Sequence, residues 1–426
     1  MNFVRNRHID KRPFWFRLHH VLRYFALVSV LLGTSSCMNK NEGSPLTVQA
    51  IGTSTPYHYN IEGILDGVHG AKIALYSITP DYSYVPLDST TVKAGRFTFN
   101  GMANGLTPAV LTLNDSIPLS SLFLEEGNTK VSINLVKESD FEGYFLSDFI
   151  LEGTPGNELY QGFQKELKTI ESSEAYLKMD ELAWELWQME DTVVQTNAKS
   201  YLQLSRKMTK LQDSIDDAIN GLRKNFVLQN NASPLAPYIL FNEGLGFNQD
   251  AYTIEELQML FNTLDVSLAN NPYYQLCQEK LERAIQLLPG QQAPNFAFHY
   301  ANHPSNSLSN LKGNYVLLEF WAYWCAPCLE SLPELKQLYE TNQGQDLTVL
   351  SIHDNYEQNI WLETHNNLKL PWEPVFMDNK GTNDTAVWQL YDIENVPTNY
   401  LIDNKGNLVG RNLTIDDIAR ILKNDL

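Results

Sequence analysis

The sequence contains few cysteines, which limits the kinds of site that it can form. Its 426 residues include four, and only the last two form a closely spaced pair: Cys37, Cys277, Cys325 and Cys328. A structural zinc site usually needs four nitrogen or sulfur ligands, supplied by two such pairs or by one pair with histidines. His353 and His365 lack the usual spacing from the pair. We therefore expect no metal.

Basic residues are also scarce. The chain has 31 Lys and Arg residues against 50 Asp and Glu residues, a formal net charge of −19. Residues 1–36 hold six of the basic residues and one acidic residue, which leaves 25 basic and 49 acidic residues in the remainder. Binding to nucleic acid requires Lys and Arg to neutralise phosphates. We therefore expect no nucleic-acid partner, and the acidity is typical of a protein that stays in solution.

The apolar run near the N-terminus is short. "YFALVSVLLG" follows a basic stretch and precedes the small residues "TSSC", which is the pattern of a signal peptide over residues 1–36. Cys37 resembles the lipidated cysteine of a bacterial lipobox, although Thr34 stands where an aliphatic residue is usual. We expect an exported envelope protein, anchored by lipid at Cys37 and facing the periplasm, with residues 37–56 as a polar tether. Secretion without lipid and a retained membrane anchor are the alternatives.

Residues 57–155 are typical of an all-β domain, either a sandwich or a small barrel. Short segments rich in β-forming residues, such as "AKIALYSI" and "TKVSINLV", alternate with turn residues. The segment "VKAGRFTFNG" predicts a hairpin in which Gly95 adopts a positive φ.

Residues 156–288 change to helical patterning, with apolar residues three and four apart. Asn157 is a candidate cap of the first helix. Cys277 stands alone in an amphipathic stretch, which predicts a buried apolar position. A disulfide to an unlipidated Cys37 is the alternative.

Residues 289–426 alternate between strand and helix patterns, which predicts an α/β domain with a central mixed sheet. The nearly continuous apolar run "NYVLLEFWAY" is typical of a strand buried on both faces. "APCLESLPELKQLYETN" predicts the following helix, and "TIDDIARILKN" predicts a last helix capped by Thr414.

The Cys325–Cys328 pair is best interpreted as a redox pair. A disulfide that closes such a small loop stabilises a fold very little, because the effect grows with loop length. The predicted helix begins at the pair, where the helix dipole and unpaired N–H groups favour thiolate over thiol. Cysteines in this setting have pKa values lowered to roughly 3.5–7.5.

"LLEFWAYWCAPC" resembles the thioredoxin active site, and the domain resembles a thioredoxin-like module of the TlpA/ResA type. The resemblance implies that Cys325 is the nucleophile and that Cys328 resolves the mixed disulfide. It implies that Trp324 flanks the nucleophile at the substrate side and that Pro333 bends the active-site helix. The position three after the second cysteine, often acidic in these modules, is Ser331 here.

"NVPTNYLID" resembles the loop whose cis-proline faces the disulfide, which places Pro397 beside Cys325. The backbone of Val396 and Thr398 would then hold a substrate strand. Glu319 stands where thioredoxin has its buried acid, so its pKa should be raised by burial. It would take the proton from Cys328; the alternative is a solvated glutamate at the sheet edge.

Residues 57–165 resemble the β-rich domain of unknown function that precedes thioredoxin-like modules in Bacteroidetes lipoproteins. That resemblance supports the domain order and assigns no substrate.

The sequence therefore predicts a thiol-disulfide oxidoreductase of the cell envelope that reduces disulfide-containing envelope proteins and receives electrons from a membrane thiol relay. It implies no metal, nucleotide or flavin cofactor. Two alternatives stay open: a surface protein that binds a ligand or protein and carries an auxiliary redox domain, and a thiol peroxidase.

Overall fold

The computed structural model describes residues 56–66, 68, 70–80, 83–114, 117–137, 144–193, 198–242, 249, 251–300, 303–323, 325–342, 347–353, 358–377 and 385–424. The expected signal peptide, nearly all of the tether, Cys37 and Trp324 lie outside these residues. Contacts divide the chain into two compact units. One comprises Met1–Trp184, Ile215–Gly246 and Asn262–Cys277, and the other comprises Glu185–Ser214, Phe247–Phe261 and Gln278–Leu426.

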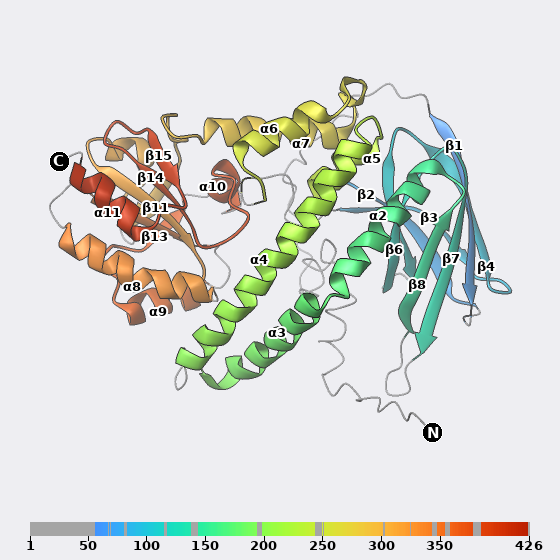
Figure 1. Ribbon diagram of the computed structural model, residues 1–426, viewed down its shortest axis with the longest axis horizontal. Helices are drawn as coiled ribbons and strands as arrows, with labels where there is room; N and C mark the ends of the chain where they lie inside the picture. The colour runs from blue at the N-terminus through green and yellow to red at the C-terminus, as the bar shows by residue number, and fades with distance from the viewer. Residues whose placement is uncertain are drawn as a thin grey trace. The chain divides into compact units, whose positions relative to one another are not determined.

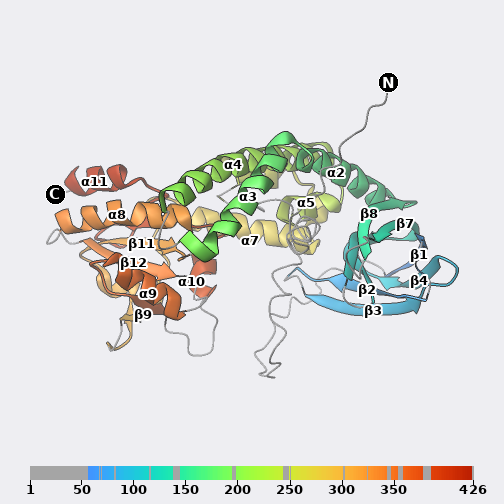
Figure 2. The ribbon, with the colours of Figure 1, turned by 90° about the horizontal axis from the view of Figure 1, so that it is seen from below.

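The first unit contains two four-stranded sheets that share one hydrophobic core (Figures 1 and 2). One sheet has the order β4 (Arg96–Ala103), β1 (Tyr57–Asp66), β7 (Gly127–Lys137) and β8 (Tyr144–Glu152). The other has the order β3 (Tyr84–Thr91), β2 (Lys72–Ile78), β5 (Thr107–Leu113) and β6 (Ile117–Leu124). The all-β character expected for this region is confirmed.

The tight hairpin turn expected at Gly95 is confirmed, but the flanking strands do not extend it. Gly95 does adopt a positive φ of 73°, and one bridge pairs Lys93 with Arg96. Beyond that turn, however, β3 pairs with β2 and β4 pairs with β1, so the chain crosses from one sheet to the other. β3 is a largely exposed edge strand that contains Pro86, a residue tolerated at sheet edges.

Helices follow β8. They are α2 (Pro155–Glu171), α3 (Glu174–Val193), α4 (Ala198–Gln229), α5 (Leu235–Asn242), α6 (Ile254–Thr263) and α7 (Pro272–Gln286), with the short 3₁₀ helix η2 at Val266–Leu268. Within the described residues, no helix has the length and apolar character needed to cross a membrane. Cys277 is fully buried, as its apolar surroundings in the sequence predicted.

The predicted capping role of Asn157 is wrong. α2 begins at Pro155 with Thr154 as its N-cap, because proline is preorganised for the first helical position. Asn157 is instead fully buried, and its side chain bonds both the N–H (2.9 Å) and the carbonyl (2.8 Å) of Phe123. The residue therefore anchors β6 to the first turn of α2.

The second unit is built around the mixed sheet that the sequence predicted. Its order is β12 (Leu347–His353), β11 (Tyr315–Trp321), β14 (Thr398–Ile402) and β15 (Leu408–Arg411), with β11 and β12 parallel and the other pairs antiparallel. Every residue of β11 is buried. Thr414 caps the last helix, since its hydroxyl accepts the N–H of Asp417 at 3.1 Å.

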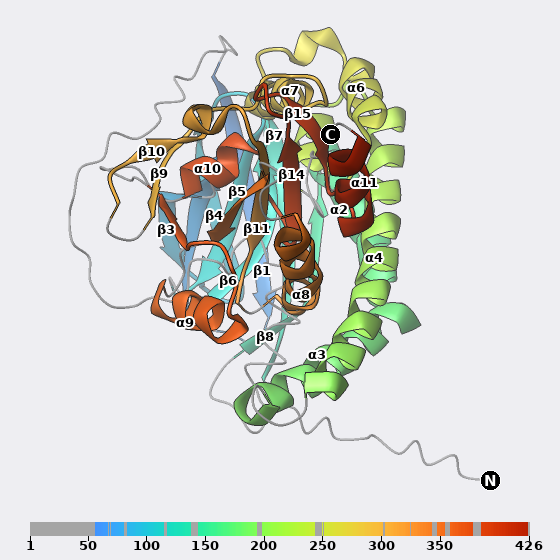
Figure 3. The same ribbon diagram turned by 90° about the vertical axis from the view of Figure 1, so that its left-hand side faces the viewer.

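Helices cover both faces of this sheet. One face packs against α8 (Ala326–Thr341), α9 (Gln358–Leu368) and α11 (Ile415–Asn424), and the other packs against α10 (Thr385–Leu390) (Figure 3). A small second sheet of β10 (Asn306–Ser307), β9 (Ala297–Tyr300) and β13 (Val375–Met377), with the 3₁₀ helix η3 (Leu308–Leu311), was not predicted.

Candidate active site

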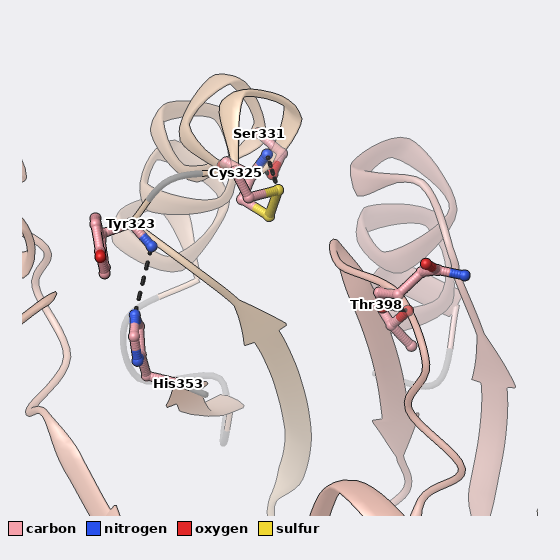
Figure 4. The surroundings of a disulfide bond; sticks show 7 residues. Tyr323, Cys325, Ser331, His353 and Thr398 are labelled. Atoms are coloured by element: carbon pink, nitrogen blue, oxygen red, sulfur yellow. Dashed lines mark hydrogen bonds between the residues drawn. A yellow bond between two sulfur atoms is a disulfide. The ribbon is translucent and has the colours of Figure 1, made fainter. Parts of the chain in front are cut away.

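The two cysteines lie at the start of α8, just after the connection from β11. Cys325 is the N-cap of α8, and a disulfide joins it to Cys328 in the first turn of that helix (Figure 4). Cys325 is 4% exposed and Cys328 is fully buried. The strand end and the helix start therefore fix both sulfur atoms at one point of the fold.

Backbone groups surround the sulfur of Cys325. The N–H of Cys328 donates to this sulfur at 3.2 Å, and the N–H of Cys325 donates to the carbonyl of Ala322 at 3.1 Å. In the reduced pair, the same helix N–H and the positive end of the helix dipole would stabilise a thiolate on Cys325.

Glu319 lies on the face of β11 that also presents Leu317 and Trp321 to the cluster containing both cysteines. Its exposed fraction is 5%, and burial raises the pKa of its carboxyl to about 8. The carboxyl therefore exchanges its proton close to neutral pH, on the side of the sheet that α8 covers.

The Val396–Pro397 peptide bond is cis, as the resemblance implied. Val396 packs against the cluster that contains both cysteines, whereas Pro397 is exposed. Thr398 is buried at the start of β14, and its hydroxyl donates to the carbonyl of Asn395 at 2.8 Å (Figure 4).

The matches to known proteins agree with this geometry. A family model described as the AhpC/TSA family matches residues 289–411, and a domain of unknown function (DUF4369) matches residues 59–160. The thioredoxin-like protein YneN of Bacillus subtilis is 29% identical over 153 residues, which are 34% of this chain and 84% of that protein. The thiol-disulfide oxidoreductase ResA of the same organism is 31% identical over 122 residues, 28% of this chain and 64% of ResA. Residues 289–411 form a thioredoxin-like domain of the AhpC/TSA family.

Solved structures also align with this thioredoxin-like domain. The thioredoxin domain of a thiol-disulfide oxidoreductase from Bacteroides vulgatus is 26% identical, covers 33% of this chain and 98% of its own, and gives a TM-score of 0.30. A thioredoxin-like protein from Bacteroides caccae is 20% identical over 55% of this chain and 90% of its own, with a TM-score of 0.37. Several of the relatives that this domain resembles are named thiol-disulfide oxidoreductases.

The thioredoxin-like domain departs from the acidic pattern after its second cysteine. Ser331 donates from its hydroxyl to the carbonyl of Cys328 at 3.0 Å, so it braces the first turn of α8. The neighbouring Glu330 pairs with the guanidinium of Arg206 at 3.1 Å.

Metal binding has no support in the described part of the chain, where no cluster of three or more His, Cys, Asp or Glu side chains could hold an ion.

His353 is a residue of the thioredoxin-like domain that the sequence did not mark as functional. It ends β12, is 4% exposed, and accepts the N–H of Tyr323 on its Nε2 at 3.4 Å (Figure 4). A lone histidine in a buried strand is usually a core residue, and no motif distinguishes it. Its position next to the cysteine loop becomes evident only when β11 and β12 pair.

Proposed function

We propose that this protein is a thiol-disulfide oxidoreductase of the cell envelope that reduces disulfide bonds in other exported proteins. The observation that carries the proposal is the Cys325–Cys328 pair at the N-terminus of α8, where a helix N–H contacts the first sulfur. A buried acid on the face of β11 that carries Leu317 and Trp321, and a cis-proline loop whose Val396 packs against the cluster of the two cysteines, support the same function.

The reaction is a transfer of two electrons from the dithiol to the substrate disulfide. The Cys325 thiolate attacks one substrate sulfur, forms a mixed disulfide and releases the other substrate sulfur as a thiolate. Glu319, when ionised, takes the proton of the Cys328 thiol, and the new thiolate attacks the Cys325 sulfur. The second substrate thiol leaves, and the Cys325–Cys328 disulfide remains.

The substrate would lie across the loop opposite the pair. The main chain of Val396 and Thr398 would hold an extended substrate segment, with the exposed Pro397 between them and Trp324 beside the nucleophile. A dithiol donor must then reduce the disulfide for another cycle, and a membrane thiol relay is the class of donor that an envelope location requires.

The location belongs to the same proposal. The basic and apolar pattern of residues 1–36 supports export, and Cys37 supports a lipid anchor. The proposed order is a signal peptide, a tether over 37–56, a β-rich domain over 57–155, a helical segment over 156–288 and the redox domain over 289–426. Replacing Cys37 by Ser should release the exported protein from the membrane fraction.

Trapping the mixed disulfide tests the chemistry. The full chain carrying Cys328→Ser should accumulate a thiol-sensitive adduct with a protein disulfide such as insulin, because its resolving thiol is missing. The matched variant Cys325→Ser should form none, and the wild type should turn over. Insulin reduction that survives in Cys325→Ser would contradict the proposal.

Redox equilibration decides the direction of transfer. A reduction potential near thioredoxin's roughly −270 mV would support a reductant, whereas a value near about −120 mV would indicate an oxidant. Peroxide turnover without disulfide exchange would instead favour a thiol peroxidase. A pair that does not cycle would leave the role to the N-terminal regions as a binding protein.

A further inference from the structure

The imidazole of His353 lies between two aromatic rings. It stacks on Tyr323 with the centroids 5.8 Å apart and the planes 8° apart, and on Trp361 with values of 5.3 Å and 19°. The ring of Trp321, its register partner on β11, is nearly perpendicular to the imidazole, with the centroids 5.4 Å apart. Three aromatic rings thus contact the histidine.

Two of these neighbours lie at the start of the connection between β11 and Cys325. Trp321 ends β11, and Tyr323 lies two residues before Cys325 in the four-residue connection to α8. Within that connection, a turn bond joins the N–H of Cys325 to the carbonyl of Ala322. The contact from Tyr323 to His353 ties the same connection to β12, an element outside the loop.

We propose that His353 is a positioning residue that fixes Tyr323 and thereby the orientation of the Cys325 sulfur toward the N–H of Cys328. The inference deepens the proposed function and rests on it. His353 does not touch the reacting sulfur in this arrangement. It acts through Tyr323, because it accepts the backbone N–H of that residue and stacks on its ring.

The chemistry of the contact explains why histidine suits this position. The Nε2 atom accepts a backbone N–H, so it must carry no proton, while the flat ring fills the space between Tyr323 and Trp361. Phenylalanine keeps the stacking and loses the acceptor. Glutamine places a polar atom near the Nε2 position, whereas asparagine is too short to reach it.

The test compares His353→Phe, His353→Gln and His353→Asn in the full, reduced chain. The readouts are the alkylation rate of Cys325 by iodoacetamide against pH, the reduction potential of the pair, and the melting temperature. Loss of the acceptor should slow alkylation at pH 7 by about threefold to tenfold, because the net effect of one hydrogen bond corresponds to that range. A less stabilised thiolate should also make the potential more negative.

His353→Gln should recover most of the wild-type rate, and His353→Asn should not. His365→Phe is the matched control, because His365 is equally buried in this unit but belongs to α9. It should leave the alkylation rate and the potential unchanged, whatever it does to melting. If His353→Phe does not fold, the comparison of Gln with Asn decides the question.

Two results would overturn the inference. One is a set of folded His353 variants whose alkylation rates and potentials equal those of the wild type. The other is an equal loss in His365→Phe, which would show a general effect of the core. Neither result touches the proposed function, which the mixed-disulfide trap and the redox equilibration of the wild-type pair test separately.

Discussion

Among single residues, Glu319 carries the clearest consequence for stability. Burial raises the pKa of its carboxyl from 4.5 to about 8, so the folded state holds a proton that the unfolded state releases. The stabilisation by this proton is complete below pH 4.5 and disappears as the pH rises to about 8. We therefore expect Glu319→Gln, which stays neutral, to gain stability over wild type by about 1.4 kcal/mol per pH unit across that window.

Denaturant unfolding at a series of pH values measures this gain. Glu62→Gln is the control, because Glu62 is exposed on β1 and its variant should stay within about 0.5 kcal/mol of wild type throughout. A gain for Glu319→Gln that does not change with pH would contradict the raised pKa. The same variant should also slow the resolution of the mixed disulfide at pH 8.

Single residues also show how far sequence reasoning reaches. Cys325, Cys328, Glu319 and Pro397 stood out because their types carry specific chemistry at recognisable spacings. The structure joins the two cysteines by a disulfide, buries Glu319 and makes the Val396–Pro397 bond cis. His353 did not stand out, because its position next to the cysteine loop depends on which strand pairs with β11. The residues around His353 in the sequence do not predict that pairing.

At the scale of elements, the start of α2 depends on a residue outside the helix. Glu125 follows β6, and its carboxylate accepts the N–H groups of Gly156 and Asn157, each at 3.0 Å. These are first-turn donors that the helix itself cannot satisfy. We expect Glu125→Ala to lower the free energy of unfolding by about 1–2 kcal/mol, the usual effect of a lost cap.

The adjacent Glu126 supplies the control for that measurement by chemical denaturation. It is exposed, and Glu126→Ala should change stability by less than about 0.5 kcal/mol. Equal losses in the two variants would mean that net charge, rather than the cap, accounts for the effect.

A second element is held by a largely buried charge. Lys280 on α7 pairs with Asp392 at 3.0 Å and with Glu394, and Asp392 is almost fully buried. Burial lowers the pKa of the Lys280 ammonium, but the two acids outweigh it and raise the pKa. Lys280→Met should therefore cost about 2–4 kcal/mol, since it leaves a buried carboxylate without its partner.

Lys178→Met tests whether any lost ion pair has this effect. The Lys178–Glu181 pair on α3 joins two exposed side chains, and such pairs contribute only about 0–1 kcal/mol. If denaturant unfolding shows similar losses for both variants, burial of Asp392 is not the cause of the larger cost.

The elements that sequence predicted well are the ones whose pattern is long. The sequence alone predicts β11, with its seven buried residues, and the helices α8 and α11. The assignment of each element depends mainly on the pattern of apolar residues within it. β9, β10 and β13 have only two to four residues, too few to show a period. The turn at Gly95 was predicted correctly, but the strands beyond it pair with other strands, because the choice of partner is decided by the whole β region.

For the whole molecule, the two compact units have separate hydrophobic cores. The core of the first lies between its two sheets and continues onto its helices, and the second has a core on each face of its mixed sheet. The sequence predicts three regions, from a change of β-rich to helical to alternating patterns. It did not show that α3, α4, α6 and α7 each contribute residues to both units, because a helix pattern does not reveal its packing partners.

Separate cores predict that the chain does not unfold in one step. We expect calorimetry of the full chain to resolve two transitions, because residues that share no core need not melt together. Glu125→Ala should lower only the transition of the first unit, and Lys280→Met only that of the second, because each residue makes its contacts within one unit. A single transition lowered by both variants would mean instead that the helices running through both units bind them into one cooperative fold.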